Sequence, residues 1–321
     1  MPFLLINYFR SMIYLLIVIA FFAVMLLYFR VADKYNIIDR PNERSSHTHV
    51  TIRGGGIIFL LAVLIGAIWY PQYWLPAAGT LLIGVISFID DRISLPNKVR
   101  IIFHLAAVSI LFISLQIFHL PAIWIALLYI IAVGIINAYN FMDGINGITG
   151  LYSLVVLGGF QWVNLRRFAF MEPDMIWLPM IACLVFLFFN FRKKARCFAG
   201  DVGSVTMAFW ILFLLLTLTL RTHNGIYFLF LSVYGVDSVL TIIHRLLRRE
   251  NIFQAHRLHF YQLMANECRI PHRIISALYA AIQGTIILFV VAFSSNWMIV
   301  SAICLLPLIL AYVLLKPRLL R

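Results

Sequence analysis

Charged residues are scarce in this chain of 321 residues: they make up 12% of it, and only 12 residues are Asp or Glu. Cysteine is rare too, and Cys183, Cys197, Cys268 and Cys304 lack the spacing of a metal site or a disulfide framework. No linker, low-complexity tract or polar stretch of domain length interrupts the sequence. These absences argue against a soluble or disulfide-stabilised protein, and we expect one unit over residues 1–321.

Hydrophobic residues make up 63% of the chain, whereas a soluble domain has about 45–50%. Apolar runs long enough for membrane helices recur along the whole length, and the first is too long for a cleaved signal peptide. The sequence therefore predicts an all-α polytopic membrane protein with about 11 transmembrane helices. The runs are 4–29, 54–70, 74–90, 99–118, 121–138, 147–164, 176–190, 204–221, 225–244, 273–293 and 296–315.

The distribution of Lys and Arg predicts the orientation, because cytoplasmic loops carry the excess of these residues. With the N-terminus outside and the C-terminus in the cytoplasm, only Arg10, Arg166, Arg167 and Arg221 of the 25 Lys and Arg lie outside. The formal charge of +13 is thus mainly a topology signal. It also suits an anionic lipid leaflet and anionic substrates, and nothing in it points to nucleic acid.

Ten of the 12 acids lie on the same predicted inner face, and only Glu172 and Asp174 lie on the outer one. Asp90 and Asp91 are adjacent at the inner end of the 74–90 run. Two carboxylates at the negative end of a helix dipole repel each other and need a positive partner. Arg92 or a divalent cation would meet that need.

A second polar group follows the 121–138 run. Asn137, Asn140, Asp143 and Asn146 recur every three residues, a spacing that places side chains on one face of a helix. Such a stripe is costly in an apolar chain and is by default functional. Glycines at 144, 147 and 150 open the backbone to a ligand.

Two further segments offer groups for phosphate. Gly200–Ser204 precedes the 204–221 run, so its N–H groups would face an anion at a helix start, and Asp201 adds an oxygen ligand for Mg²⁺. In the loop 248–262, His256, Arg257 and His259 form a basic group able to hold a pyrophosphate or a lipid phosphate. Zinc is disfavoured there because no third and fourth ligands are near.

Two places are less decisive. His47, His49 and Arg53 lead into Gly54–Gly56, which fits either a ligand-binding loop or a flexible one. Asp237 lies inside the 225–244 run. It is either a functional intramembrane acid or a partner that holds helices together.

Taken together, these motifs and their order resemble the polyprenyl-phosphate N-acetylhexosamine-1-phosphate transferase family, of glycosyltransferase family 4 type. The resemblance covers nearly the whole chain. DGINGITG and AHRLHFYQ are most similar to the branch that initiates O-antigen and common-antigen synthesis. Asn146 departs from the pattern, since many relatives have a second Asp there, and we do not assign it to a metal.

The resemblance implies a role for each matching position. Asp90, Asp91 and Asp143 would be catalytic, and Asp201 would bind Mg²⁺, with Mn²⁺ as the alternative and Asp90 or Asp91 as possible co-ligands. The positions expected to bind substrate are Arg53, Asn140, Asn190, Phe198, Gly203, Ser204, His256, Arg257 and His259. The resemblance alone implies a homodimer.

The implied reaction transfers an N-acetylated amino-sugar 1-phosphate from a UDP-sugar to undecaprenyl phosphate in the bacterial inner membrane and releases UMP. A peptidoglycan-type phospho-N-acetylmuramoyl-pentapeptide transferase is the alternative within the family, and a polyprenyl-lipid transporter or flippase is the alternative outside it. The sequence leaves open the sugar, the Asp that orients the nucleophile, and a one-step or two-step route.

Overall fold

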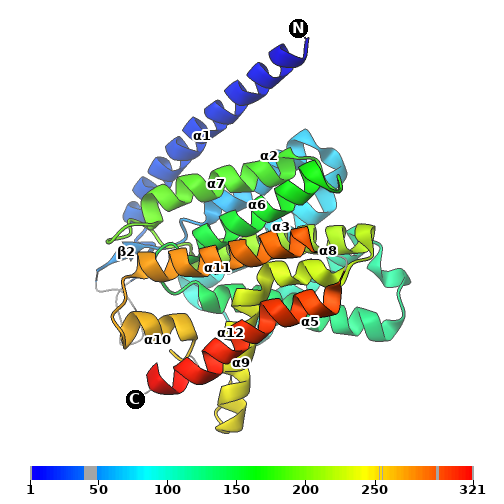
Figure 1. Ribbon diagram of the computed structural model, residues 1–321. Helices are drawn as coiled ribbons and strands as arrows, with labels where there is room; N and C mark the ends of the chain where they lie inside the picture. Colours follow the sequence, from blue (N-terminus) through cyan, green and yellow to red (C-terminus); the bar gives the residue numbers. More distant parts are fainter. Residues whose placement is uncertain (1, 40–48, 253, 255, 294–295, 320–321) are drawn as a thin grey trace.

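The computed structural model describes residues 2–39, 49–252, 254, 256–293 and 296–319, with side chains described from Arg10 onward. Within these residues the protein is helical apart from one two-stranded antiparallel ribbon, and Figure 1 shows the arrangement. The α-helices are α1 (Pro2–Lys34), α2 (Ile57–Trp69), α3 (Trp74–Ile93), α4 (Asn97–Ser114), α5 (Ala122–Met142), α6 (Ile148–Arg166), α7 (Asp174–Asn190), α8 (Gly200–Thr222), α9 (Ser232–Leu247), α10 (Phe260–Asn266), α11 (His272–Ala292) and α12 (Trp297–Leu319). The remaining elements are β1 (Ile38–Asp39), β2 (Thr51–Ile52) and the 3-10 turns η1 (Pro71–Tyr73), η2 (Ile117–His119) and η3 (Gly225–Leu231).

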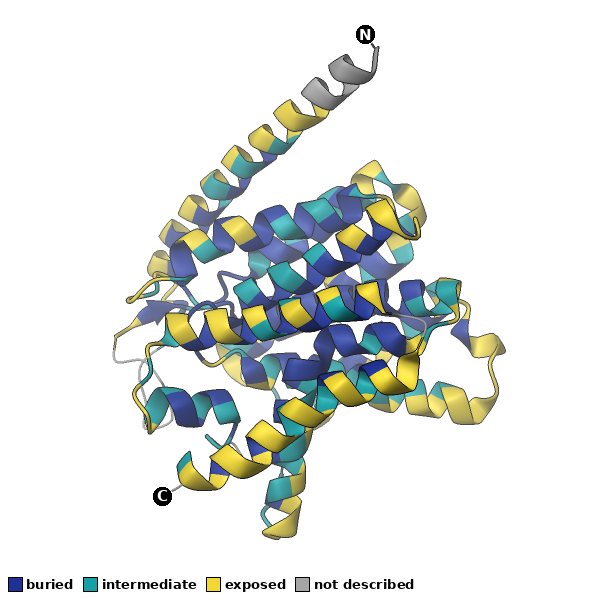
Figure 2. Cartoon of the chain, viewed as in Figure 1, coloured by how far each residue is buried: buried dark blue, intermediate teal, exposed yellow. Residues whose placement is uncertain are grey.

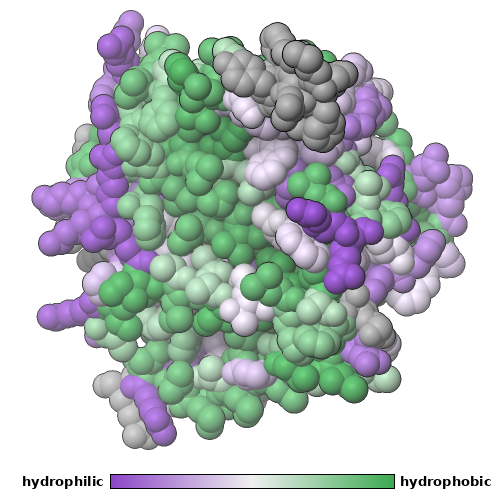
Figure 3. All heavy atoms as spheres, turned by 45° about the horizontal axis from the view of Figure 1, so that its top comes forward, coloured by the Kyte–Doolittle hydropathy of each residue, from purple (hydrophilic) through white to green (hydrophobic). Residues whose placement is uncertain are grey.

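Ten of the 11 expected apolar runs coincide with one α-helix each, and the run 225–244 falls on η3 and α9. This confirms the expectation of an all-helical polytopic membrane protein, whereas the exact number of membrane spans stays a prediction. Among the described residues, nine segments are long and apolar enough to cross a membrane, and α2 and α7 are shorter apolar helices. In Figure 3 an apolar band separates hydrophilic groups at the left and right edges of the molecule. The orientation of the termini stays a prediction.

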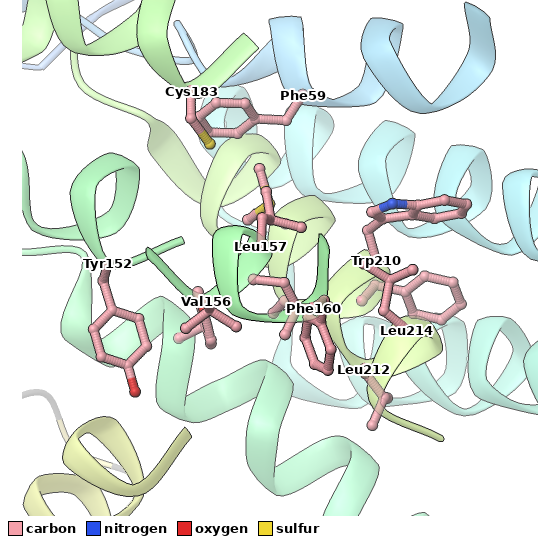
Figure 4. Packing of buried hydrophobic residues seen from close by; sticks show 14 of the residues in the cluster. Phe59, Tyr152, Val156, Leu157, Phe160, Cys183, Trp210, Leu212 and Leu214 are labelled. Atoms are coloured by element: carbon pink, nitrogen blue, oxygen red, sulfur yellow. The ribbon is translucent and has the colours of Figure 1, made fainter. Parts of the chain in front are cut away.

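The centre of the bundle is α8, and 94% of its most apolar stretch is buried. Helices α2, α3 and α5 pack around it, whereas α1 and α12 expose most of their surface (Figure 2). The core draws large side chains from α2, α6, α7 and α8, including Phe59, Phe160 and Trp210 (Figure 4). Exposed leucines and isoleucines on the outer helices fit a lipid environment, where apolar surface carries no penalty.

Close packing of α2 on α8 requires glycine. A Cβ on Gly56, directly before α2, would lie 2.2 Å from the Cα of Gly203. Small residues allow backbones in membrane proteins to approach closely, and van der Waals packing then holds the helices. The glycines at 54–56 therefore allow their backbone to approach the backbone of residues 197–203 closely. This contact fixes the start of α2 against the start of α8.

Candidate functional site

Two of the aspartates meet where the C-terminal end of α3 lies against the N-terminal end of α8. The Asp91 side chain is fully buried, and its oxygens accept hydrogen bonds from the backbone N–H groups of Asp201 (2.9 Å) and Val202 (3.1 Å). Asp91 thus caps α8 from another helix, at the end where the dipole stabilises negative charge. Gly200 is required beside it, since its φ is +70° and a Cβ would lie 2.5 Å from Asp91 Oδ2.

This contact corrects the expectation that Gly200–Ser204 offers free N–H groups to a phosphate. The helix begins at Gly200, not at Ser204, and two of its first N–H groups already bind Asp91. Gly203 packs against Gly56, and the fully buried Ser204 hydroxyl donates to the carbonyl of Gly200 (3.2 Å). The contact of Gly203 and Ser204 with substrate stays a prediction.

Arg53 supplies the positive charge that the buried carboxylates need. Its Nε lies 2.7 Å from Asp91 Oδ1, and its Nη2 lies 3.5 Å from Asp201 Oδ1. The backbone of Arg53 is fixed as well, because Tyr28 donates a hydrogen bond to its carbonyl (2.6 Å). Arg53 therefore bridges two acids that belong to different helices.

Asp90 has a different cation. Arg100 Nη1 lies 3.1 Å from Asp90 Oδ2, and the backbone N–H of Leu95 donates to Oδ1 (2.5 Å). Of the two alternatives considered for these acids, the structure does not bear out Arg92, because Arg92 instead donates to the carbonyl of Tyr35 (2.8 Å). The arginines that do pair with these acids are Arg53, in the loop before α2, and Arg100, on α4.

Asp143 lies just beyond α5, within electrostatic range of Asp201 and Arg53. It accepts a hydrogen bond from the Thr149 hydroxyl (2.6 Å). Burial, reinforced by Asp201 and opposed by Thr149 and Arg53, raises the pKa of its carboxyl to about 7. This carboxyl therefore changes its charge near neutral pH, a property that is common at functional sites.

The expected polar stripe is only partly helical. Asn137 and Asn140 lie on α5, but the helix ends at Met142, so Asp143 and Asn146 are not on its face. Gly147 turns the chain with φ +89°, and the buried Asn146 donates to the carbonyl of Arg192 (2.9 Å). Helical spacing therefore does not apply to residues after Met142, where the helix ends.

Asn190 and Phe198 connect the same loops. The buried Asn190 accepts a hydrogen bond from Gly147 N (2.6 Å) and donates one to the carbonyl of Cys197 (2.8 Å). Phe198 pairs with Ile52 through its backbone (2.8 Å). These contacts fix the walls around the acids, and the expected proximity of both residues to the nucleotide stays a prediction.

The histidine loop comes to the same end of the bundle, before α10. His256 and His259 lie with ring centroids 5.0 Å apart, and the His259 ring is 6.1 Å from that of Phe141, two residues before Asp143. Burial, and then the neighbouring His259, lowers the pKa of His256 to about 4, so this imidazole is neutral at pH 7. Arg257 is described within this loop, whereas His47 lies outside the described residues. Binding by His256, Arg257 and His259 stays a prediction.

The side chains of this site are compatible with Mg²⁺. Within the described ranges, no three His, Cys, Asp or Glu side chains form a ready metal-binding group. Mg²⁺ does not need one, because it binds through one or two carboxylates together with substrate phosphates and water. Four aspartates face two arginines here, and the Asp201 side chain is 19% exposed. The residues therefore fit a divalent cation held by Asp201 and one neighbouring acid.

The fold and this site define a polytopic helical membrane protein with an arginine-bridged cluster of aspartates at one end of its helices. Residues 73–219 match the profile of Glycosyl transferase family 4. This segment of the chain is thus similar to Glycosyl transferase family 4, and it includes Asp90, Asp91, Asp143 and Asp201.

Relatives of known name agree with this assignment. The chain is 27% identical over 259 residues to a probable undecaprenyl-phosphate N-acetylglucosaminyl 1-phosphate transferase of Bacillus subtilis, covering 74% of this chain and 72% of that protein. It is 28% identical over 283 residues to an undecaprenyl-phosphate alpha-N-acetylglucosaminyl 1-phosphate transferase of Escherichia coli, covering 78% and 75%. A phospho-N-acetylmuramoyl-pentapeptide-transferase of Thermotoga neapolitana is 26% identical over 227 residues, covering 64% and 74%.

Proposed function

We propose that this protein transfers an N-acetylated amino-sugar 1-phosphate from a UDP-sugar to undecaprenyl phosphate and releases UMP, at the cytoplasmic face of a bacterial inner membrane. The reaction would begin the synthesis of a lipid-linked surface polysaccharide. The observation that carries the proposal is the cluster of Asp90, Asp91, Asp143 and Asp201 with Arg53, which lies at one end of a membrane-embedded bundle. The names of the Bacillus and Escherichia relatives support the substrate class.

The proposed chemistry moves one phosphoryl group. An oxygen of the lipid phosphate forms a bond to the sugar-bearing phosphorus of the UDP-sugar, the bond from that phosphorus to the bridging oxygen breaks, and UMP leaves with the electron pair. The second pKa of a phosphate monoester is about 6, so the nucleophile is already largely ionised at neutral pH. Catalysis then consists mainly of positioning two anions and neutralising their charge.

The residues of the chain divide this work. Asp201, with Asp90 or Asp91, would hold Mg²⁺, which neutralises charge on the diphosphate when bound. Arg53 is close enough to Asp201 to contact the same diphosphate. The partly ionised Asp143 would orient the attacking oxygen or take up its residual proton.

The match to the Thermotoga peptidoglycan enzyme covers less of this chain than the match to the Escherichia enzyme, 64% against 78%, which favours the amino-sugar branch over the pentapeptide branch. A flippase is the remaining alternative class. A flippase would need basic loops for lipid phosphate, but a cluster of four aspartates, three of them paired with arginines, has no evident use in lipid transfer across a bilayer.

The test is UMP release by purified protein in detergent with undecaprenyl phosphate, Mg²⁺ and one UDP-sugar at a time. We expect lipid-dependent UMP from one donor, and its loss with EDTA. Asp201→Asn should reduce the rate at least about 100-fold, the effect typical of removing a group that stabilises transition-state charge. Asp174→Asn is the matched control, because Asp174 is also buried but binds Arg10 on α1 (2.8 Å), apart from the cluster.

Two results would contradict the proposal. One is an absence of UMP from every donor together with an absence of UDP-sugar binding by well-folded protein. The other is equal UMP release by the Asp201 and Asp174 variants per folded molecule, because the aspartate cluster would then have no part in the reaction.

A further inference from the structure

Asp237 is a carboxylate buried in the middle of α9, with 4% of its surface exposed. A buried charge is destabilising unless hydrogen bonds and opposite charge compensate it. Here the compensation comes from α10 and α11 as well as from α9. The carboxylate therefore connects three helices at a single point.

Most of these contacts lead to the start of α10. Oδ1 accepts a hydrogen bond from Phe260 N (2.9 Å) and lies 3.3 Å from Nδ1 of His259. Oδ2 accepts one from the Tyr279 hydroxyl of α11 (2.8 Å) and a longer one from Tyr261 N (3.4 Å). Asp237 thus caps α10 and contacts the histidine immediately before it.

The contact with His259 fixes the arrangement of its ring. An ionised carboxylate only accepts hydrogen bonds, so the hydrogen must be on Nδ1 of His259. Its Nε2 lies at the opposite edge of the ring, is buried, and has no hydrogen-bond partner among the described residues. A buried polar atom without a partner requires an explanation, and a ligand that contacts Nε2 supplies one.

A second connection leads from α10 to the segment that carries Asp143. The Tyr261 hydroxyl donates to the carbonyl of Phe141 (2.8 Å). Tyr261 also lies so close to Gly144 that a Cβ there would be 2.2 Å from the hydroxyl oxygen. The position of α10 is therefore tied to both sides of Asp143.

We propose that Asp237 is a positioning residue for the reaction, and this inference rests on the proposed function. It holds Nδ1–H of His259 so that the lone pair of Nε2 accepts a hydrogen bond from a substrate hydroxyl or a protonated phosphate oxygen, and it keeps α10 against the 141–144 segment. A carboxylate that orients a functional imidazole commonly changes activity about 10–100-fold when it is replaced.

The first test is a double-mutant cycle on UMP release with Asp237→Asn and His259→Gln. Asparagine retains the shape and one acceptor, but its amide no longer selects Nδ1–H. We expect Asp237→Asn to lower kcat about 10–100-fold with KM for the UDP-sugar changed less than about 3-fold. In the His259→Gln background the same change should have almost no further effect, because the residue acts through that histidine.

Thr241→Val is the matched control. Thr241 donates to the same carboxylate (3.3 Å) and bonds Tyr312 of α12 (2.7 Å), but it does not contact His259. We expect a lower melting temperature and a normal kcat per folded molecule. If the Asp237 and His259 effects multiply in the cycle, the proposal is overturned and Asp237 has a general structural role.

The second test does not depend on activity. In ¹⁵N-histidine NMR spectra, with the His259 signal assigned by its absence in His259→Gln, wild-type His259 should carry hydrogen on Nδ1, and Asp237→Asn should remove that preference. A wild-type signal with hydrogen on Nε2 alone would refute the proposal even if UMP is released. Conversely, an inactive wild type with the expected signal would count against the proposed function only. If Asp237→Asn does not fold, Asp237→Glu replaces it in both tests, with a smaller loss of kcat that again vanishes in the His259→Gln background.

Discussion

Removal of the Arg53 guanidinium is the most direct perturbation of the aspartate cluster. Arg53→Gln would leave the fully buried Asp91 without its cation and would increase its repulsion with Asp201. Breaking a buried ion pair costs about 3–5 kcal/mol, whereas an exposed pair contributes about 1 kcal/mol or less. The Arg53 side chain is 34% exposed, and the α8 N–H groups still bind Asp91, so we expect a loss of about 2 kcal/mol.

A loss of this size is measurable by thermal unfolding in detergent. With roughly 2–4 °C per kcal/mol for a chain of a few hundred residues, the melting temperature should fall by about 4–8 °C. Because Mg²⁺ bound at the proposed site would bring positive charge to the same carboxylates, added Mg²⁺ should stabilise Arg53→Gln more than wild type. Lys193→Gln is the control, since it removes one positive charge from an exposed position.

Two results would contradict this role of Arg53. An unchanged melting temperature for Arg53→Gln would mean that Asp91 does not depend on this guanidinium. Equal stabilisation of variant and wild type by Mg²⁺ would mean that the cation and Arg53 do not share the carboxylates. UMP release should follow the same pattern, with the larger deficit of the variant at low Mg²⁺.

Two other positions give separate predictions. The folded-state pKa of Asp143, about 7, lies above that of an unfolded Asp near 4, so its contribution to stability is complete below about pH 4 and is lost as pH rises through 7. The melting temperature should fall between about pH 4 and 7, less steeply in Asp143→Asn; parallel curves would contradict this. Gly56→Ala places a Cβ 2.2 Å from Gly203 Cα and should cost about 1–3 kcal/mol or prevent folding. Gly225→Ala, with nothing within 4 Å, should be near neutral in the same melting assay.

The helices were predictable from the sequence because a membrane leaves the backbone few alternatives. Every peptide group in hydrocarbon must be hydrogen-bonded within the protein, so a long apolar run becomes a helix whatever its neighbours are. Helix α2 begins only at Ile57, later than the run 54–70, because Gly54–Gly56 turn before it. Helix α7 begins at Asp174, two residues before the run 176–190. Helix existence followed from composition, and helix ends depended on glycines and caps.

The site was less predictable because its contacts join distant segments. The motifs correctly indicated which acids gather at one end, but Arg53 and Asp91 come from different elements, and neither sequence position indicates the other. The placement of Asn146 on the helical stripe was wrong, and the sequence held a visible signal of this, because the stripe was extended past Gly144, beyond the end of the helix at Met142. The link between Asp237 and His259 had only a weak signal, a lone acid in an apolar run.

These contacts also decide which groups can meet the charge of two phosphate substrates. His256 is neutral at pH 7 because burial lowers its pKa to about 4, so the permanent positive charge beside the acids belongs to arginines. Arg53 and Arg100 are already paired with Asp91 and Asp90. An incoming diphosphate must therefore either take Arg53 from the carboxylates or meet a cation that is already bound there and can take the place of Arg53. The two routes differ in outcome, since only the second predicts that Mg²⁺ restores part of the stability of Arg53→Gln before any substrate is added.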